Sequence, residues 1–258
     1  MDNDDRQLGR ILSRRDVLKL LGLTGASLLA GCVPALTNTF QATSNPTQAG
    51  SLANATALPD SALPACVVRP EATEGPYFVD EGLNRSDVRS DPASGVVKAG
   101  APLTLGFNVS QVGANGCTPL EGARVEIWHC DAGGVYSDVA DPRVNTKGQK
   151  FLRGYQLTDA RGQANFMTIY PGWYPGRTVH IHFKVIQTGS GGSSVFTSQL
   201  FFEDALTDRV FAVEPYASRG QRDTLNNRDG IYKDQLLLKV SETGSGYAGV
   251  FDIGLQSG

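Results

Sequence analysis

The segment Thr-Val-His-Ile-His-Phe at residues 178–183 alternates apolar and histidine side chains, which is the period of a half-buried β-strand. His180 and His182 therefore leave one face of the predicted strand, while the apolar residues leave the other. Side chains two apart on a strand are separated by roughly 6.5–7 Å along it, a gap that two imidazoles can close onto one metal ion. The chain has only three histidines. Two of them on one strand face indicate either a metal site or a pair of polar residues on a solvated face, and the residues before the strand decide between the two.

A tight turn precedes this strand. Residues 170–176 read Tyr-Pro-Gly-Trp-Tyr-Pro-Gly, and proline and glycine constrain the backbone so that an aromatic side chain is held at the end of the strand. A phenol beside two imidazoles is a ligand set for a hard, oxidised metal such as Fe(III), whereas a structural zinc site more usually has thiolates. The pattern therefore predicts a metal centre with tyrosine and histidine ligands.

Residues 168–175 and 177–183 together resemble the iron-binding signature of the intradiol ring-cleavage dioxygenases, and are most like the protocatechuate 3,4-dioxygenase beta-chain branch of that family. Three further motifs agree with the family in order and spacing, so the resemblance covers most of residues 66–255. These motifs are Thr-Glu-Gly-Pro-Tyr-Phe at 73–78, Val-Glu-Ile-Trp at 125–128 leading to Gly-Val-Tyr at 134–136, and Ser-Gln-Leu-Phe-Phe at 198–202. Four ordered motifs are far more specific than any one of them.

The resemblance implies which residues hold the metal and which act on the substrate. Four side chains are the implied ligands of a non-haem Fe(III): Tyr136, Tyr174, His180 and His182. A water or hydroxide would occupy the fifth position. The catalytic arginine falls on Arg177 and the substrate-facing glutamine on Gln199, and Tyr77 is expected to line the pocket. Fe(III) with two tyrosinates and one hydroxide sums to zero charge, and a neutral cluster can be buried at tolerable cost.

The same resemblance implies the reaction. A catechol binds as a dianion and displaces Tyr174, and O2 then opens the ring between the two hydroxyl-bearing carbons to give a cis,cis-muconate. Two alternatives remain open from the residues alone: a transthyretin-like sandwich that binds a partner or small ligand without catalysis, and a zinc hydrolase built on the two histidines. The identity of the catechol and the formation of a homo-oligomer also stay open.

Two features fall outside the family pattern. The interval from Tyr174 to His180 is shorter than in well-known members, which predicts a more open pocket. His129 follows Val125 and Ile127 at intervals of two residues, so the three share one face of the predicted strand. We therefore interpret His129 as a packed strand histidine and not as a ligand.

The first 31 residues carry an export signal. Ser-Arg-Arg-Asp-Val-Leu-Lys at 13–19 is a twin-arginine signature, and the apolar stretch 20–30 after it is too short to anchor the chain across a bilayer. Leu-Ala-Gly-Cys at 29–32 matches a lipobox, which predicts cleavage before Cys32 and lipidation of its thiol. We therefore expect export by the twin-arginine route and a lipid anchor in a bacterial membrane that faces the periplasm or the exterior.

Residues 32–62 are expected to form a disordered tether behind the lipidated cysteine. The stretch is rich in Ala, Thr, Ser, Asn and Pro, and its only charge is Asp60, so it has no apolar period from which to build a core. The net charge of the whole chain is −3 at pH 7. With no basic run in the chain, the charge pattern argues against nucleic acid as a partner.

The remaining cysteines allow one disulfide. An exported protein can oxidise its thiols, and Cys66 and Cys117, which both flank loop-like sequence, are the candidate pair. Cys130 lies at a strand end beside the predicted site and is expected to be a buried thiol.

Residues 63–258 predict one all-β domain, a single antiparallel β-sandwich with long irregular loops, which the family resemblance also implies. Turn signals separate short alternating runs, and no amphipathic helix of convincing length appears outside the signal peptide. The predicted strands are 103–109, 125–130, 178–185, 195–202, 235–240 and 248–255.

Overall fold

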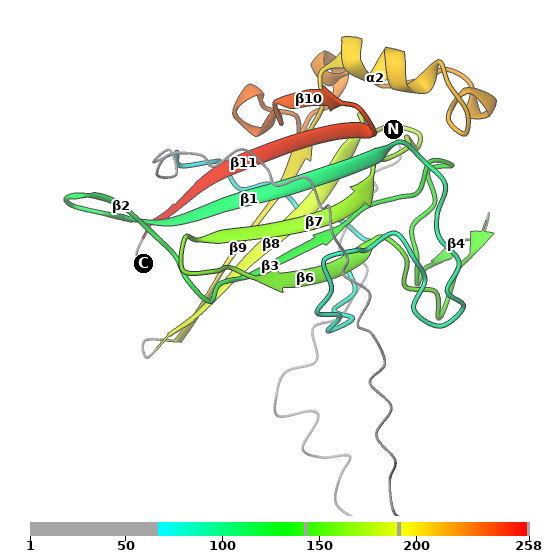
Figure 1. The fold of residues 1–258 in the computed structure, drawn as a ribbon. Coiled ribbons are helices and arrows are strands. Elements are labelled where there is room, and N and C mark those ends of the chain that lie inside the picture. The colour runs from blue at the N-terminus through cyan, green and yellow to red at the C-terminus, as the bar shows by residue number, and fades with distance from the viewer. Residues whose placement is uncertain (1–66, 142–143, 190–191, 257–258) are drawn as a thin grey trace, which may run out of the picture. The chain divides into compact units, whose positions relative to one another are not determined.

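Two β-sheets packed against each other form the framework, with irregular loops and one short α-helix around them (Figure 1). The computed structural model describes residues 67–141, 144–189 and 192–256, all within one compact unit. Within these ranges, no helix has the length and apolar character needed to cross a membrane. The all-β sandwich predicted from the sequence is confirmed.

The predicted signal peptide at 1–31, the predicted tether at 32–62 and the cysteines Cys32 and Cys66 lie outside the described residues.

The sheets differ in their strand order. The first runs β10 (Val240–Thr243), β11 (Gly246–Gln256), β1 (Pro102–Gly113) and β2 (Gly116–Pro119), and β7 (Gln163–Ile169) also pairs with β1. The second runs β6 (Arg153–Leu157), β3 (Arg124–Trp128), β8 (His180–Gly189) and β9 (Gly192–Phe201). A separate two-stranded piece consists of β4 (Ala140–Asp141) and β5 (Val144–Asn145).

The main hydrophobic core lies between the two sheets. Phe107 in β1 and Phe251 in β11 face it from the first sheet, and Phe183 in β8 faces it from the second, with its ring centroid 5.2 Å from Phe107 and 5.6 Å from Phe251. Side chains alternate along a strand, so placing Phe183 in this core turns His180 and His182 to the outer face of the second sheet. The predicted alternation at the start of β8 thus decides on which side of the sandwich the histidines lie.

Three details differ from the sequence expectations. β1 and β11 pair in parallel, so the first sheet is mixed and not purely antiparallel. Residues 235–240 do not form the predicted strand: a 3-10 turn, η3 (Asp234–Leu236), occupies the start, and β10 begins only at Val240. A short α-helix, α2 (Asp204–Phe211), follows β9 and buries Leu206 and Val210, which are one helical turn apart.

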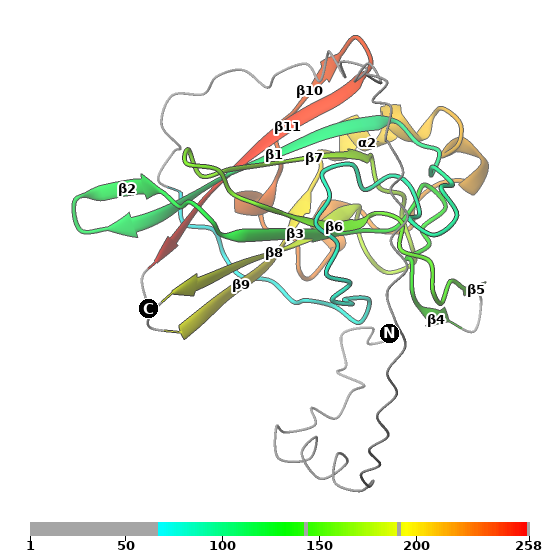
Figure 2. The ribbon, with the colours of Figure 1, turned by 60° about the horizontal axis from the view of Figure 1, so that its bottom comes forward.

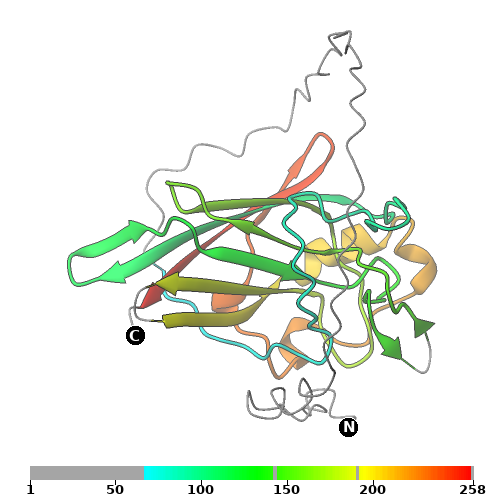
Figure 3. The same cartoon turned by 90° about the horizontal axis from the view of Figure 1, so that it is seen from below.

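Residues 70–78, hereafter the cover segment, lie across the outer face of the second sheet. The backbone N–H of Ala72 donates to the carbonyl of Thr197 at 3.0 Å, and the side-chain amide of Gln199 donates to the carbonyl of Thr73 at 2.9 Å. Figures 2 and 3 show the start of the described chain, in cyan, running beside β9. The outer face that carries the histidines is therefore enclosed, although it lies outside the main core.

Cys117 in β2 is disulfide-bonded, whereas Cys130 is a buried free thiol. The expected partner, Cys66, precedes Val67, whose carbonyl accepts a hydrogen bond from Gly254 N at 2.7 Å. A Cβ added at Gly254 would lie 2.7 Å from Val112, and Val112 pairs with Cys117 in the β1–β2 register. The described chain next to Cys66 therefore runs close to Cys117, which supports the predicted pairing.

We predict that proteolysis of the unreduced protein releases one cross-linked peptide that contains both Cys66 and Cys117. Mass spectrometry before and after reduction checks this, and alkylation without reduction should label Cys130 only after unfolding, because that thiol is buried. A cross-link from Cys117 to Cys32, or none in protein purified under oxidising conditions, would contradict the pairing.

Candidate active site

His180 and His182 lie together at the start of β8 and are almost completely buried. Their Nε2 atoms are 3.1 Å apart. Nδ1 of His180 donates to the carbonyl of Thr178 at 2.6 Å, so the proton is on Nδ1 and the Nε2 lone pair is left for another partner. Burial lowers the pKa of both imidazoles, which keeps them neutral and able to act as ligands at neutral pH.

Tyr174 completes a close group of three donors. Its hydroxyl lies 3.2 Å from Nε2 of His180. Two donors that bind one metal at about 2.0–2.1 Å are themselves roughly 3 Å apart, so these separations suit a shared cation. The short turn between Tyr174 and His180 is closed by the N–H of Arg177, which donates to the Tyr174 carbonyl at 3.4 Å.

Tyr136 comes from a different loop and lies beside this group. Its ring centroid is 5.7 Å from that of Tyr174 and 6.2 Å from that of His182. The side chain is only 3% exposed, and its hydroxyl, near that of Tyr174, makes no hydrogen bond of normal geometry within the described residues. Tyr77 from the cover segment stacks on the Tyr136 ring at 4.5 Å.

Two glycines allow the loops of Tyr136 and Tyr174 to approach each other. A Cβ on Gly134, whose φ is +80°, would lie 2.1 Å from the carbonyl oxygen of Trp173, and a Cβ on Gly172 would lie 2.4 Å from that of Asp131. Both contacts are with backbone atoms, so any side chain at these positions would push the loops apart. The distance between the two tyrosines therefore depends on glycine at both sites.

The residues fit a hard trivalent metal. Burial raises the pKa of the Tyr136 and Tyr174 phenols, and a bound cation is the group that can remove such protons. A buried phenol without a partner is costly, and a metal would satisfy it. No cluster of three His, Cys, Asp or Glu side chains suited to a metal occurs among the described residues. For a metal bound by the two histidines, the tyrosines are the candidate further protein ligands, and anionic phenolate oxygens suit Fe(III).

His182 is held by packing and not by a hydrogen bond. Its Nδ1 is buried and has no hydrogen-bond partner in the described structure, although a metal-binding histidine usually donates from its second nitrogen. The indole of Trp128 instead lies parallel to the imidazole, 5.0 Å away and tilted by 9°. Gly75 of the cover segment approaches so closely that a Cβ there would lie 3.1 Å from Cε1 of His182. The orientation of this ring therefore depends on β3 and on the cover segment.

Arg177 is fixed behind the donor group by two partners. Its Nε donates to Asp229 at 2.9 Å and its Nη2 donates to the side-chain oxygen of Gln199 at 2.6 Å. Gln199 pairs with His182 across the β8–β9 register, which places it beside the histidines. Burial alone would lower the pKa of Arg177, but electrostatic interactions with Tyr174 and Asp229 raise it, so the guanidinium stays charged.

Asp229 is not among the site residues predicted from the sequence. The carboxylate also accepts the backbone N–H groups of Thr178 at 2.8 Å and of Ile231 at 2.8 Å, so it joins the turn after η2 (Asn226–Arg228) to the start of β8. In the sequence it lies in the run Asn-Arg-Asp-Gly at 227–230, which by itself indicates only a turn. Asp229 therefore positions Arg177.

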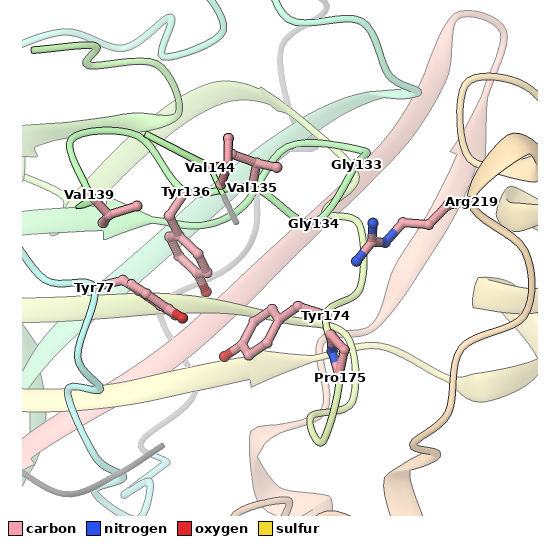
Figure 4. A pocket seen from close by; sticks show the side chains of 10 residues that line it. All are labelled: Tyr77, Gly133, Gly134, Val135, Tyr136, Val139, Val144, Tyr174, Pro175 and Arg219. Carbon is pink, nitrogen blue, oxygen red and sulfur yellow. The ribbon is translucent and has the colours of Figure 1, made fainter. Parts of the chain in front are cut away.

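A pocket of about 250 Å³ opens beside Tyr136 and Tyr174 (Figure 4). Tyr77 lines it, as expected from the sequence, and exposed Pro175 from the short turn before β8 lies at its edge. In Figure 4 the hydroxyls of the three tyrosines gather on one side, whereas Arg219 approaches from the other. A small aromatic molecule can therefore enter with one polar end directed at the donor group.

His129 lies outside the donor group, as predicted. It is fully buried, its Nδ1 donates to the carbonyl of Cys130 at 2.8 Å, and its Nε2 accepts from the Thr168 hydroxyl at 2.6 Å. Cys130 is equally unavailable, because its thiol donates to the Gly172 carbonyl and burial raises its pKa. Both nitrogens of His129 are thus used within the protein.

Comparison with known proteins agrees with this site. A sequence model of a family described as Dioxygenase matches residues 73–256, from the start of the Thr-Glu-Gly-Pro-Tyr-Phe motif to the end of β11. The protocatechuate 3,4-dioxygenase beta chain of Burkholderia cepacia is 32% identical over 192 residues, which cover 70% of this chain and 76% of the relative. Catechol 1,2-dioxygenase 1 of Acinetobacter lwoffii is 27% identical over 196 residues, covering 64% of this chain and 58% of the relative.

Solved structures show the same relationship. The intradiol ring-cleavage dioxygenase of Tetranychus urticae has a TM-score of 0.65 and 30% identity, covering 74% of this chain and 95% of its own. The dioxygenase domain of a carbohydrate-binding fusion protein from Streptomyces sp. SirexAA-E has a TM-score of 0.52 and 29% identity. The match covers 74% of this chain and 100% of that domain's chain. The chain therefore belongs to the intradiol ring-cleavage dioxygenase family, whose members are non-haem iron enzymes.

We predict that Asp229→Asn lowers kcat/KM for a catechol by about tenfold or more, while the bound metal and the visible spectrum stay those of the wild type. The substitution removes the negative charge that holds Arg177 but leaves all four proposed metal ligands. Steady-state kinetics and metal analysis check this, with Asp208→Asn as the control, because the Asp208 carboxylate is exposed and pairs with Arg222. Loss of metal from Asp229→Asn would show that Asp229 supports the metal site and not Arg177.

We predict that His129 makes the protein less stable in acid. Burial lowers its pKa from 6.5 to about 4 in the folded state, so between these values the unfolded chain binds the proton and the folded chain does not. The stability that the protein gains from keeping His129 neutral is fully present above pH 6.5. As the pH falls towards 4, the free energy of unfolding decreases by roughly 3 kcal/mol at most through this group. The free energy of unfolding of His129→Asn, measured in urea at several pH values, should fall less steeply over this window than that of the wild type. Parallel curves would contradict the assignment.

Proposed function

We propose that this protein is a non-haem Fe(III) dioxygenase that opens a catechol ring between its two hydroxylated carbons, with O2, to give a cis,cis-muconate-type product. One observation carries the proposal: Nε2 of His180 lies 3.2 Å from the Tyr174 hydroxyl and 3.1 Å from Nε2 of His182, beside the buried hydroxyl of Tyr136, which makes no hydrogen bond of normal geometry within the described residues. Both relatives described above are named for opening aromatic diols.

The two tyrosines and two histidines would hold the metal. When bound, Fe(III) would draw electron density from a catecholate so that a ring carbon can react with O2. The protein's part is to bind and orient the diol, to receive its protons and to limit the access of water. The sum of reactants and products balances, because both oxygen atoms of O2 enter the opened product.

Tyr174 is suited to receive a proton from the incoming diol. Its phenol lies at the pocket and its environment favours the protonated form, since burial raises its pKa. In this structure the protonated phenol can donate to the Nε2 lone pair of His180, 3.2 Å away, and a bound metal would take that lone pair in its place. Tyr136 is more deeply buried and is stacked under Tyr77, so it is the tyrosine that stays in place.

Arg177 is suited to stabilise negative charge that develops on the ring. Its guanidinium is held in advance by Asp229 and Gln199, so little reorganisation is needed during the reaction. Gln199 is fully buried and donates to the carbonyl of Thr73, which links Arg177 to the cover segment. Arg177 and Gln199 therefore form one positioned unit beside the histidines.

The two alternative functions have less support. A zinc hydrolase commonly uses a third histidine or a carboxylate as a ligand, and the described residues offer neither beside His180 and His182. A binding module without catalysis would have no need for a buried arginine held by a carboxylate next to two histidines and two tyrosines.

We also propose that the protein is exported by the twin-arginine route and anchored by lipid on Cys32, facing the periplasm or the exterior. The proposal rests on the order of twin arginine, apolar stretch and lipobox in residues 13–32. The substrate would then be a catechol present outside the cytoplasm.

We predict unequal effects for the two tyrosines. Tyr174→Phe removes the group that receives the substrate proton, so turnover should fall by about 100-fold or more even where iron is retained. Tyr136→Phe should weaken iron binding and alter the visible spectrum whether or not catechol is present. Single-turnover kinetics, iron analysis and spectra of both variants, with identification of the muconate by mass spectrometry, check this. Wild-type turnover by Tyr174→Phe on every catechol tested would refute the assignment.

We predict that Cys32→Ser moves the protein from the membrane fraction to the soluble fraction while ring cleavage per bound iron stays unchanged. The thiol is the lipidation point of the predicted lipobox and lies far along the chain from the site residues. Fractionation of cells that express each form, followed by immunoblotting, measures the distribution. An unchanged distribution would contradict the lipid anchor.

A further inference from the structure

The pocket beside the tyrosines contains one formally charged side chain. Aromatic, aliphatic and glycine residues make up the rest of its described lining, and the exception is Arg219 from the 3-10 turn η1 (Ala217–Arg219). Figure 4 shows the guanidinium directed towards Gly134 and Tyr174 and well away from the three tyrosine hydroxyls. The pocket therefore has a phenolic side and a cationic side.

The guanidinium of Arg219 is held in a fixed position. Its Nε donates to the carbonyl of Trp173 at 2.8 Å, and its carbon lies 4.7 Å from the centroid of the Trp173 indole. Gly134 permits this approach, since a Cβ there would lie 2.9 Å from Nη2 of Arg219. No hydrogen bond or ion pair in the described part of the chain uses either Nη atom, so both remain available to a ligand.

Three other cations around the site have acidic partners. Arg177 pairs with Asp229, Lys184 pairs with Glu74, and Lys98 pairs with Asp131 at 2.6 Å. Arg219 has no such partner among the described residues. An unpaired guanidinium at the wall of a largely apolar pocket attracts an anion, and its planar donors suit a carboxylate.

We infer that Arg219 binds a carboxylate carried by the substrate at a position remote from the two ring hydroxyls. The inference rests on the proposed function, because the catechol oxygens are directed to the tyrosine and histidine donors. Arg219 lies on the other side of the pocket, so a carboxylate on a short side chain para to one hydroxyl is the group that can reach it. The substrate class is a catechol with an acidic side chain, such as a 3,4-dihydroxyphenyl alkanoate.

A matched pair of substrates tests this inference. For wild type, Arg219→Gln and Arg219→Lys, kcat/KM is measured with 3-(3,4-dihydroxyphenyl)propanoate and with its primary amide, which has nearly the same shape and no charge. The acid-to-amide ratio cancels any general loss of activity that follows from disturbing Trp173. Arg209→Gln is the control, because Arg209 is an exposed arginine of α2 that pairs with Glu242.

The acid-to-amide ratio of kcat/KM should fall about tenfold or more in Arg219→Gln, mainly because KM for the acid rises. In Arg219→Lys the ratio should fall less. In the wild type it should decrease with added salt. Arg209→Gln should keep the wild-type ratio. Equal losses for acid and amide in Arg219→Gln would show that Arg219 only supports the Trp173 loop, and would overturn the inference.

Binding measurements separate this inference from the proposed function. Calorimetric titration of the purified protein with the acid and with the amide, in the absence of O2, needs no turnover. Tighter binding of the acid that is lost in Arg219→Gln, without ring cleavage of any catechol by the wild type, would support the anion site and reject the dioxygenase. Ring cleavage of catechols by the wild type, with equal affinity for the acid and the amide, would support the dioxygenase and reject the anion site.

Discussion

The arrangement of this protein depends on buried donor groups that satisfy one another only in part. Nε2 of His180 lies 3.1 Å from Nε2 of His182 and 3.2 Å from the hydroxyl of Tyr174, and the hydroxyl of Tyr136 nearby makes no hydrogen bond of normal geometry in the described structure. Burial keeps both imidazoles and both phenols neutral, so without a cation the group holds costly unpaired polar atoms. A single trivalent metal would convert this cost into four favourable contacts.

The rest of the fold serves to hold these donors in place. The main core between the sheets fixes β8, and the opposite face of that strand, with the histidines, lies under the cover segment. Trp128, Cys130 and Tyr136 form a second, smaller hydrophobic cluster there, with Tyr77 and Phe78 of the cover segment packed against it. Because loops, strand and cover segment all meet at this cluster, the pocket has a rigid wall on the metal side and an exposed edge at Pro175.

Much of this could be predicted from the sequence, because strand period and motif order are local properties. The alternation in β8 predicted the histidine face, and the tight turn before it predicted the place of Tyr174. Residues 235–240 were wrongly predicted as a strand, since burial of Leu236 and Leu238 imitates alternation where a 3-10 turn stands. Asp229 and Arg219 could not be found this way, because their partners lie 52 and 46 residues away in the chain.

Metal analysis of the purified protein, with a visible spectrum recorded before and after anaerobic addition of catechol, tests the central claim most directly. Tyrosinate bound to Fe(III) absorbs visible light, so the protein should contain stoichiometric iron, be coloured, and change its spectrum when catechol replaces Tyr174. A colourless protein that contains zinc, or one that binds no metal after exposure to iron, would contradict the account.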